Sequence, residues 1–207
     1  AVYADPIITD YSDYVMIPVE IREISKSDGS FGSIKASYHG SSYSKITHIY
    51  YGFYFGRFNN VVFYNKNSGN SHLLLNKKAL ISSFYFPYEK EEGKDKPVTK
   101  FLLFGISDKD TNGDGLINEK DAIVGYVSDL SGKNLQQVTP ENTQLMDLRI
   151  DKNIDAIFLR IKKDSNNDKR FSDEDDISVF RINLSNPNTG MEIISDQISK
   201  EVNSIFN

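Results

Sequence analysis

The chain has 207 residues, of which 39% are hydrophobic, which is enough to bury a core in a single domain. Its net charge of −5 argues against a nucleic-acid partner, because phosphate contacts require clustered lysine and arginine. It contains no cysteine, which excludes disulfides, thiolate zinc sites, iron–sulfur clusters and cysteine nucleophiles. No stretch reaches the roughly 18 consecutive apolar residues that a membrane-spanning helix requires.

Short β-like segments follow one another along most of the chain. They are rich in β-branched and aromatic residues, and polar turns such as NKNSGN separate them. Residues 88–97 (YEKEEGKDKP) interrupt the series and are predicted to form a charged surface loop. The predicted strands are 14–23, 33–38, 45–55, 61–64, 71–75, 81–86, 100–106, 122–127, 135–138, 145–150, 156–162, 177–184 and 191–194.

The last segment, 196–206, has a different period. Ile198, Val202 and Ile205 recur at the spacing of one helix face. Ser195 precedes them, and its side chain is of the type that caps a helix N-terminus. The sequence therefore predicts an all-β fold with one short C-terminal helix.

Part of the sequence repeats with an offset of 54 residues. The matched positions are Asp110 with Asp164, Asn112 with Asn166, Asp114 with Asp168, and Asp121 with Asp175. A fainter earlier copy begins at Val61. We expect repeated antiparallel units of about four strands at roughly 60–121, 122–175 and 176–195, with the N-terminal strands at 13–58 available to complete the last unit.

Residues 123–140 (IVGYVSDLSGKNLQQVTP) resemble a blade of the TolB-like β-propellers, in which two strands enclose an Asp-rich turn with glycine and lead to Thr-Pro. This resemblance implies blade-like units within one domain spanning 1–207, in a bacterial protein of the cell envelope. Three recognisable units are fewer than the four blades of an ordinary closed propeller. An incomplete propeller, an open stack of sheets and a β-sandwich are therefore alternatives at this point.

Two acidic loops of twelve residues carry the clearest chemical signal. The first, DTNGDGLINEKD at 110–121, resembles the EF-hand loop in its dockerin-type version, which ends in Asp. Such a loop surrounds calcium with about seven oxygen ligands at roughly 2.3–2.6 Å. Gly115 stands sixth, where the turn requires a positive φ, and Ile117 stands eighth as an apolar anchor. The predicted ligands are Asp110, Asn112, Asp114, the carbonyl of Leu116, Asn118 and Asp121.

The second loop, DSNNDKRFSDED at 164–175, has the same arrangement. Phe171 takes the place of the apolar anchor. Lys169 stands where glycine is expected, which costs on the order of 1 kcal/mol at a positive φ and places a positive charge beside the cation. The predicted ligands are Asp164, Asn166, Asp168, the carbonyl of Arg170, Ser172 and Asp175. The sequence therefore predicts two calcium (Ca²⁺) sites, of which the second either binds more weakly or has a modified loop.

Strand-like sequences flank both loops, such as KFLLFGI before the first loop and AIVGYV after it. The resemblance thus carries over the ligands but not the helix pair of an EF-hand, and the opening motion of a calcium sensor is not expected. Each ion is predicted to tie two strands together. Because weak sites of roughly 10⁻⁴–10⁻³ M fill only where calcium is abundant, we expect a secreted, periplasmic or cell-surface protein. A lipid anchor would lie before residue 1.

No catalytic motif accompanies these loops. His39, His48 and His72 are scattered without metal-ligand spacing, and no GxSxG motif is present. The aromatic run at 43–64 is interpreted as core strand, with a sugar- or peptide-binding surface as the alternative. We expect a binding or scaffold module for a protein or glycan ligand, rather than an enzyme. The alternative is an envelope hydrolase with structural calcium, which a pocket holding His48 or His72 beside a nucleophile would favour.

Overall fold

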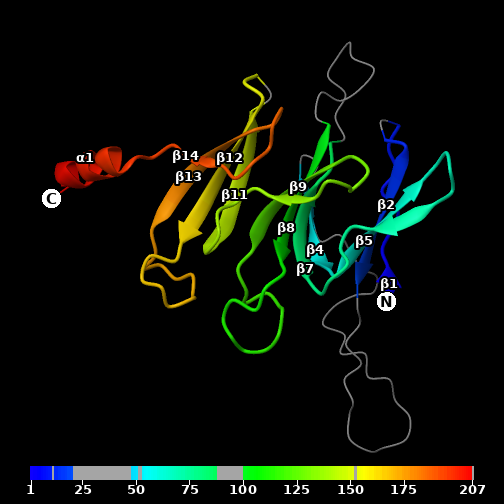
Figure 1. The fold of residues 1–207 in the computed structure, drawn as a ribbon, viewed down its shortest axis with the longest axis horizontal. Helices are drawn as coiled ribbons and strands as arrows, with labels where there is room; N and C mark the ends of the chain where they lie inside the picture. The colour runs from blue at the N-terminus through cyan, green and yellow to red at the C-terminus, as the bar shows by residue number, and fades with distance from the viewer. Residues whose placement is uncertain (11, 21–47, 51–52, 88–99, 152, 207) are drawn as a thin grey trace, which may run out of the picture.

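The computed structural model describes residues 1–207 except 11, 21–47, 51–52, 88–99, 152 and 207. The described residues form an all-β fold of three antiparallel sheets with one short C-terminal helix, which confirms the predicted class at this level (Figure 1). The predicted strand at 33–38 and the predicted charged loop at 88–97 lie outside the described residues.

The first sheet has the strand order β1-β2-β5-β6. Its strands are β1 (Val2–Tyr3), β2 (Tyr14–Glu20), β5 (Asn60–Asn65) and β6 (Ser71–Leu73). In β5, Val61 and Phe63 are fully buried while their neighbours are more exposed, as expected for a strand with one face on the core. The two-residue strand β1 was not predicted, because so short a segment has no readable period.

The second sheet is the central one, with the order β10-β9-β8-β7-β4-β3. Its strands are β3 (His48–Tyr50), β4 (Phe53–Phe58), β7 (Leu80–Tyr85), β8 (Phe101–Ser107), β9 (Val124–Asp129) and β10 (Gln136–Gln137). Every residue of β8 is buried, which explains its continuous apolar run FLLFGIS. The single strand predicted at 45–55 is wrong: β3 and β4 are two strands paired with each other, and a run of apolar residues does not show where the chain reverses.

The third sheet has the order β11-β12-β13-β14. Its strands are β11 (Thr143–Asp151), β12 (Ala156–Lys163), β13 (Ile177–Asn183) and β14 (Met191–Glu192). The N-terminal strands β2 and β4 pair with β5 and β7 in the first and second sheets, rather than with the C-terminal strands.

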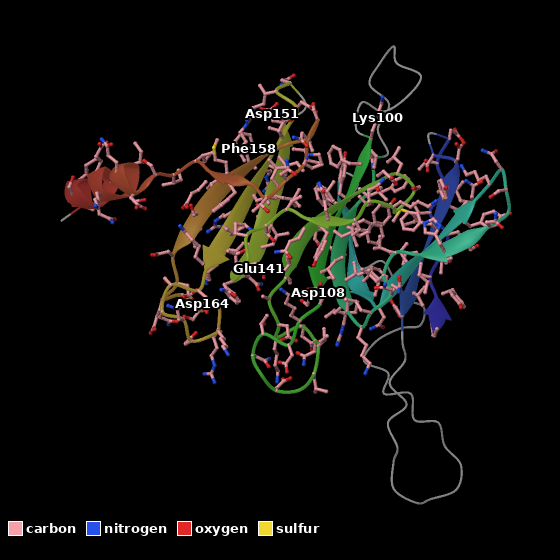
Figure 2. The ribbon with its side chains drawn as sticks, viewed as in Figure 1. Lys100, Asp108, Glu141, Asp151, Phe158 and Asp164 are labelled. Atoms are coloured by element: carbon pink, nitrogen blue, oxygen red, sulfur yellow. The ribbon has the colours of Figure 1, made fainter. Side chains whose placement is uncertain are left out.

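Two apolar clusters pack the three sheets in a row (Figures 1 and 2). One cluster joins the first and second sheets and contains Phe63 and Phe104. The other joins the second and third sheets and contains Leu103 and Ile157. Because Leu103 and Phe104 are consecutive in β8, this strand places alternate side chains in both cores.

The helix α1 (Asp196–Phe206) ends the described chain, with the bounds predicted from its period. The Ser195 hydroxyl accepts a hydrogen bond from the Ile198 backbone N–H at 3.3 Å, which confirms the predicted N-cap. No residue of α1 is buried. Among the described residues, no helix combines the length and the apolar character needed to span a membrane.

Candidate metal sites

Each acidic loop connects two neighbouring antiparallel strands of one sheet. Residues 110–121 lie between β8 and β9 of the second sheet, and residues 164–175 lie between β12 and β13 of the third. Both loops lie at the same end of the stacked sheets (Figure 1). The prediction that strands, not helices, flank both loops is confirmed.

The predicted ligands of the first loop turn inward onto the loop backbone. The two carboxylate oxygens of Asp110 accept hydrogen bonds from the backbone N–H groups of Gly113 and Gly115, each at 2.7 Å. The side-chain oxygens of the next three predicted ligands do the same: Asn112 accepts from the Asp114 N–H, Asp114 from the Leu116 N–H, and Asn118 from the Lys120 N–H, all at 2.9 Å. Side-chain oxygens therefore line the inner side of the curled chain.

Asp121, the last predicted ligand, joins the two limbs of the first loop. One carboxylate oxygen accepts the Thr111 N–H at 2.8 Å, and the other accepts the Asn118 N–H at 2.8 Å. The residue is only 2% exposed. A buried carboxylate held by backbone donors on both sides fixes the closed shape of the loop.

The second loop repeats this pattern with different residues. The carboxylate of Asp164 accepts the N–H groups of Asp168 and Lys169, at 3.0 and 3.1 Å. The buried Asp175 accepts the N–H groups of Ser165 and Ser172, at 3.1 and 2.8 Å. The hydrogen bond from the Ser172 backbone holds the pKa of Asp175 below its usual range, so this side chain is an anion at neutral pH.

Both loops use the left-handed backbone conformation at the same two positions. The sixth residue has φ of 83° at Gly115, which confirms the positive φ predicted there, and φ of 64° at Lys169, so the second loop keeps the same conformation at this position. The fourth residue has φ of 74° at Gly113 and 59° at Asn167. A Cβ atom at Gly115 would meet nothing within 4 Å, so this glycine is favoured by its backbone conformation and not by lack of space.

The carboxylates of each loop are hydrogen-bonded to amides rather than grouped around one point. Within the part of the chain that the structure describes, no three aspartate, glutamate, histidine or cysteine side chains lie close enough together to hold a metal ion. In the first loop such a group would need Asp110, Asp114 and Asp121 to converge. The other predicted ligands are asparagine and serine side chains and backbone carbonyl groups, which are not among these four residue types.

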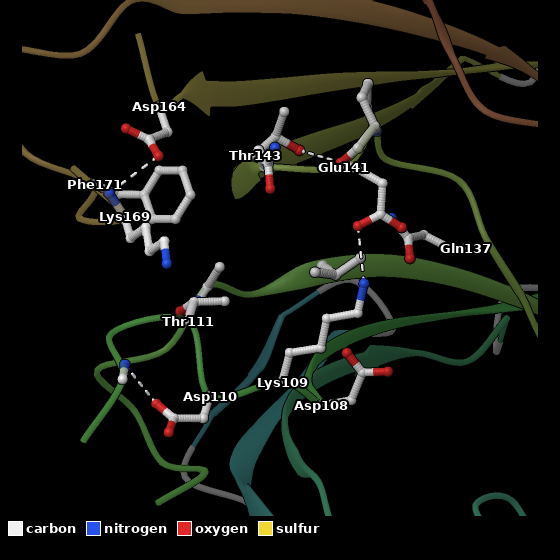
Figure 3. Close-up of a pocket in the computed structure, with 15 residues that line it drawn as sticks. Asp108, Lys109, Asp110, Thr111, Gln137, Glu141, Thr143, Asp164, Lys169 and Phe171 are labelled. Carbon is white, nitrogen blue, oxygen red and sulfur yellow. Dashed lines mark hydrogen bonds and ion pairs between the residues drawn. The ribbon is translucent and has the colours of Figure 1, made fainter. Parts of the chain in front are cut away.

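The two loops border a common cavity of about 270 Å³ between the second and third sheets (Figure 3). Asp110 and Thr111 line it from the first loop, and Asp164, Lys169 and Phe171 line it from the second. The Lys169 side chain extends into the space between the loops (Figure 3). The sequence analysis missed this proximity, because it arises only when the two sheets stack.

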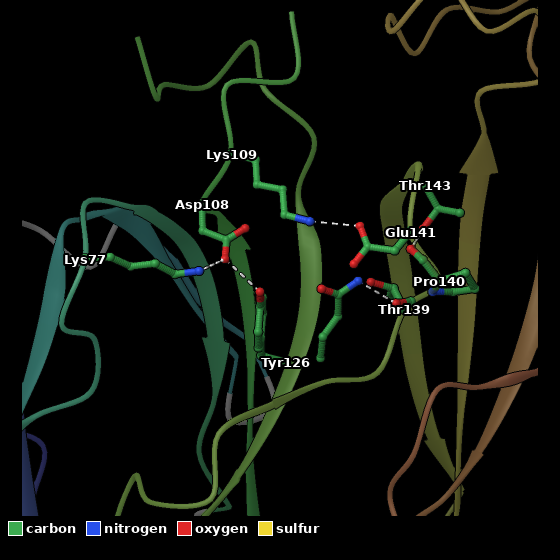
Figure 4. A network of polar contacts seen from close by, with 9 residues as sticks. Lys77, Asp108, Lys109, Tyr126, Thr139, Pro140, Glu141 and Thr143 are labelled. Atoms are coloured by element: carbon green, nitrogen blue, oxygen red, sulfur yellow. Dashed lines mark hydrogen bonds and ion pairs between the residues drawn. The ribbon is translucent and has the colours of Figure 1, made fainter. Parts of the chain in front are cut away.

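A polar network lies where the first loop leaves β8 (Figure 4). The buried Asp108 accepts hydrogen bonds from the Lys77 ammonium at 2.5 Å and the Tyr126 hydroxyl at 2.7 Å. Burial and the neighbouring carboxylate raise the pKa of Tyr126, so its hydroxyl keeps the proton that it donates. Lys109 pairs with Glu141 at 2.9 Å and links the first loop to the segment before β11. No pattern in the sequence indicates this network, because it joins residues distant in the chain.

The one histidine whose side chain is described has a packing role. The His72 Nε2 atom lies 2.9 Å from the Ser131 backbone oxygen, and its ring stacks on Phe63 at 5.6 Å between centroids. His39 and the side chain of His48 lie outside the described residues. In the aromatic run, Phe58 and Phe63 are fully buried and Tyr54 stacks on Phe84, which supports the interpretation of this run as core.

Comparisons with models of known protein families and with curated proteins give no match for this sequence. The two acidic loops combine inward-facing oxygens, a buried closing carboxylate and two left-handed positions, and each lies between a pair of adjacent strands.

Proposed function

We propose that the protein is an extracytoplasmic calcium-binding module in which each acidic loop binds one structural calcium ion. The observation that carries this proposal is the match between two loops of different sequence. Both turn the first, third and fifth side chains onto equivalent backbone amides, and both bury the twelfth carboxylate. Lys169 adopts the left-handed conformation of Gly115 although this conformation is unfavourable for lysine.

Calcium would act as a staple between strands. A hard divalent cation prefers oxygen ligands and tolerates six to eight of them in flexible geometry. It would draw Asp110, Asp114 and Asp121 together in the first loop and offset their mutual repulsion. Because the first loop joins β8 to β9 and the second joins β12 to β13, each ion would hold together one pair of strands in one sheet.

We further propose that the stacked sheets are repeated blade-like units, as the resemblance to TolB-like propellers implies. The row of three face-packed antiparallel sheets supports this. The unit boundaries predicted at 121/122 and 175/176 fall inside the second and third sheets, between β8 and β9 and between β12 and β13, so the units of this proposal are the sheets and not the predicted ranges. The same resemblance and the need for abundant calcium support an envelope or secreted location. In this proposal the module presents a rigid surface to a protein or glycan ligand.

Metal content tests the proposal directly. In millimolar calcium, the wild-type protein is expected to bind two calcium ions per chain by elemental analysis and calorimetry. The Asp110→Ala, Asp114→Ala double variant is expected to bind one, because it removes two charged ligands of the first loop only. The matched control is Asp147→Ala with Asp151→Ala, which removes two aspartates outside the loops and should leave two ions. A wild-type protein that binds no calcium would refute the proposal.

The Lys169→Gly variant tests the difference between the loops. Because glycine adopts the left-handed backbone conformation without the strain that lysine has there, this substitution is expected to raise the free energy of unfolding by about 1 kcal/mol in the absence of calcium. Removing the ammonium is also expected to tighten calcium binding at the second loop. Lys169→Ala separates the two causes, because it removes the charge but keeps the strained conformation. Denaturant unfolding in chelator measures the stability effect, and calorimetry with calcium measures the affinity effect. If Lys169→Gly and Lys169→Ala have the same free energy of unfolding in chelator, the left-handed conformation at this position does not cost stability.

A further inference from the structure

The C-terminal helix α1 has an apolar face that nothing in the described chain covers. Ile198, Val202 and Ile205 lie on one face and are 45%, 46% and 76% exposed. Isolated helices shorter than about 12–15 residues are marginal in water, and α1 has 11 residues. Its stability therefore requires a surface on which this face can pack.

The position of α1 keeps it away from its own core. Figure 1 shows the helix beyond the third sheet, at the end of the row of sheets opposite to the first sheet. The segment leading to it also exposes apolar side chains, with Met191 68% and Ile193 42% exposed. The apolar surface thus extends from β14 into α1.

The third sheet also has an outer face, opposite the core that it shares with the second sheet, on which Arg160 is exposed and Phe158 and Val179 are half-buried. Ile157, Leu159 and Ile161 of β12 pack in the core shared with the second sheet. Because side chains alternate along a strand, Phe158 and Arg160 point to the opposite face. On the neighbouring strand β13, Arg181 lies opposite Phe158 and Val179 lies opposite Arg160. Met191 of β14 lies opposite Arg181, on the same face.

The helix and this outer face are complementary in character. The face combines the apolar Phe158 and Val179 with the cations Arg160 and Arg181. Strand β11 adds Arg149 opposite Phe158 and Asp147 opposite Arg160, and these two form an ion pair with each other, so the face has an excess of positive charge. The helix carries two acidic residues, Asp196 and Glu201, against one lysine. Glu201 immediately precedes Val202 and so borders the apolar face. A membrane surface fits the helix less well, because membrane-surface helices are rich in lysine and arginine.

We propose that two copies of this chain associate by exchange of their C-terminal helices, each α1 packing on the outer face of the third sheet of the other copy. Each chain provides both surfaces, so a two-fold arrangement buries both helices and both faces through one repeated contact. The apolar faces supply the affinity, and Glu201 against the arginines fixes the orientation. This contact is independent of calcium and of the proposed metal sites.

Light scattering coupled to gel filtration tests the association. The wild-type protein is expected at twice the 23.5 kDa mass of the chain when it is concentrated. Val202→Asp is expected to elute as a folded monomer, because it places a charge in the contact. The matched control is Asn203→Asp, which adds the same charge one position further along, about 100° around the helix from Val202 and outside the line of apolar side chains, and should stay dimeric. A wild-type protein that is monomeric at its highest concentration would overturn the proposal.

Crosslinking distinguishes exchange from packing of α1 on its own chain. The chain has no cysteine, so a Val179→Cys, Val202→Cys double variant carries one thiol on the sheet face and one on the helix. A short bis-maleimide is expected to give covalent dimers. The control pair Val179→Cys, Asn203→Cys should react far less. A monomer with an internal crosslink would show that the helix packs on its own sheet and would overturn the exchange.

Discussion

Calcium is expected to raise the free energy of unfolding of this protein, and chelation is expected to lower it. Ligand binding to the folded state stabilises it by mass action, by about 2.7 kcal/mol per site when free calcium is a hundred times its dissociation constant. Above that constant, each tenfold increase in calcium adds about 1.4 kcal/mol per site. Two sites should therefore shift the melting temperature by roughly 10 °C or more between chelator and saturating calcium.

The slope of stability against the logarithm of calcium concentration counts the sites. Wild-type protein should show twice the limiting slope of the Asp110→Ala, Asp114→Ala variant, whose second loop is intact. Denaturant unfolding at several calcium concentrations measures both slopes, and magnesium at equal concentration is the control for ionic strength. If the unfolding midpoint is the same in chelator and in calcium, the ions do not staple the strands.

The sequence predicted the loops better than their surroundings, because their structure is local. The Asp and Asn spacing of 110–121 and the glycine at position 115 are sufficient to predict inward oxygens and a positive φ. At Lys169 the same reasoning left a modified loop as an alternative, because the residue type argues against a positive φ, and the structure has a positive φ there. In each case the partners of a side chain lie within about ten residues of it.

The arrangement of the strands was less predictable, because it depends on distant contacts. Period and composition located most strands but did not indicate that β2 pairs with β5, more than 40 residues later. They also did not show that the 45–55 run is a pair of strands, since no polar residue marks the reversal. The common cavity of the two loops follows from sheet stacking, and the network at Asp108 follows from the order of β7, β8 and β9 in the second sheet, so both were missed for the same reason.

The Asp121→Ala variant is expected to lose about 3 kcal/mol of stability even in chelator, where no calcium contributes. Its carboxylate accepts backbone N–H groups from Thr111 and Asn118, and it also lies 3.3 Å from the Thr111 hydroxyl. Leaving partly buried donors without an acceptor costs roughly 1–3 kcal/mol for each. Denaturant unfolding in chelator measures the loss, and calorimetry should show that the first calcium site is lost as well.

Asp114→Ala is the matched control, because it removes a predicted ligand of the same loop that is exposed and that, among the described residues, accepts only the Leu116 N–H. In chelator it should change stability by no more than about 0.5 kcal/mol, as for most surface substitutions. In calcium both variants lose the first ion, so the difference between their free energies of unfolding should be the same as in chelator. Asp175→Ala should reproduce the large loss in the second loop, since its carboxylate joins Ser165 to Ser172 in the same way. Equal stability of the Asp121 and Asp114 variants in chelator would mean that the buried carboxylate does not hold the loop closed, and that its burial serves the ion alone.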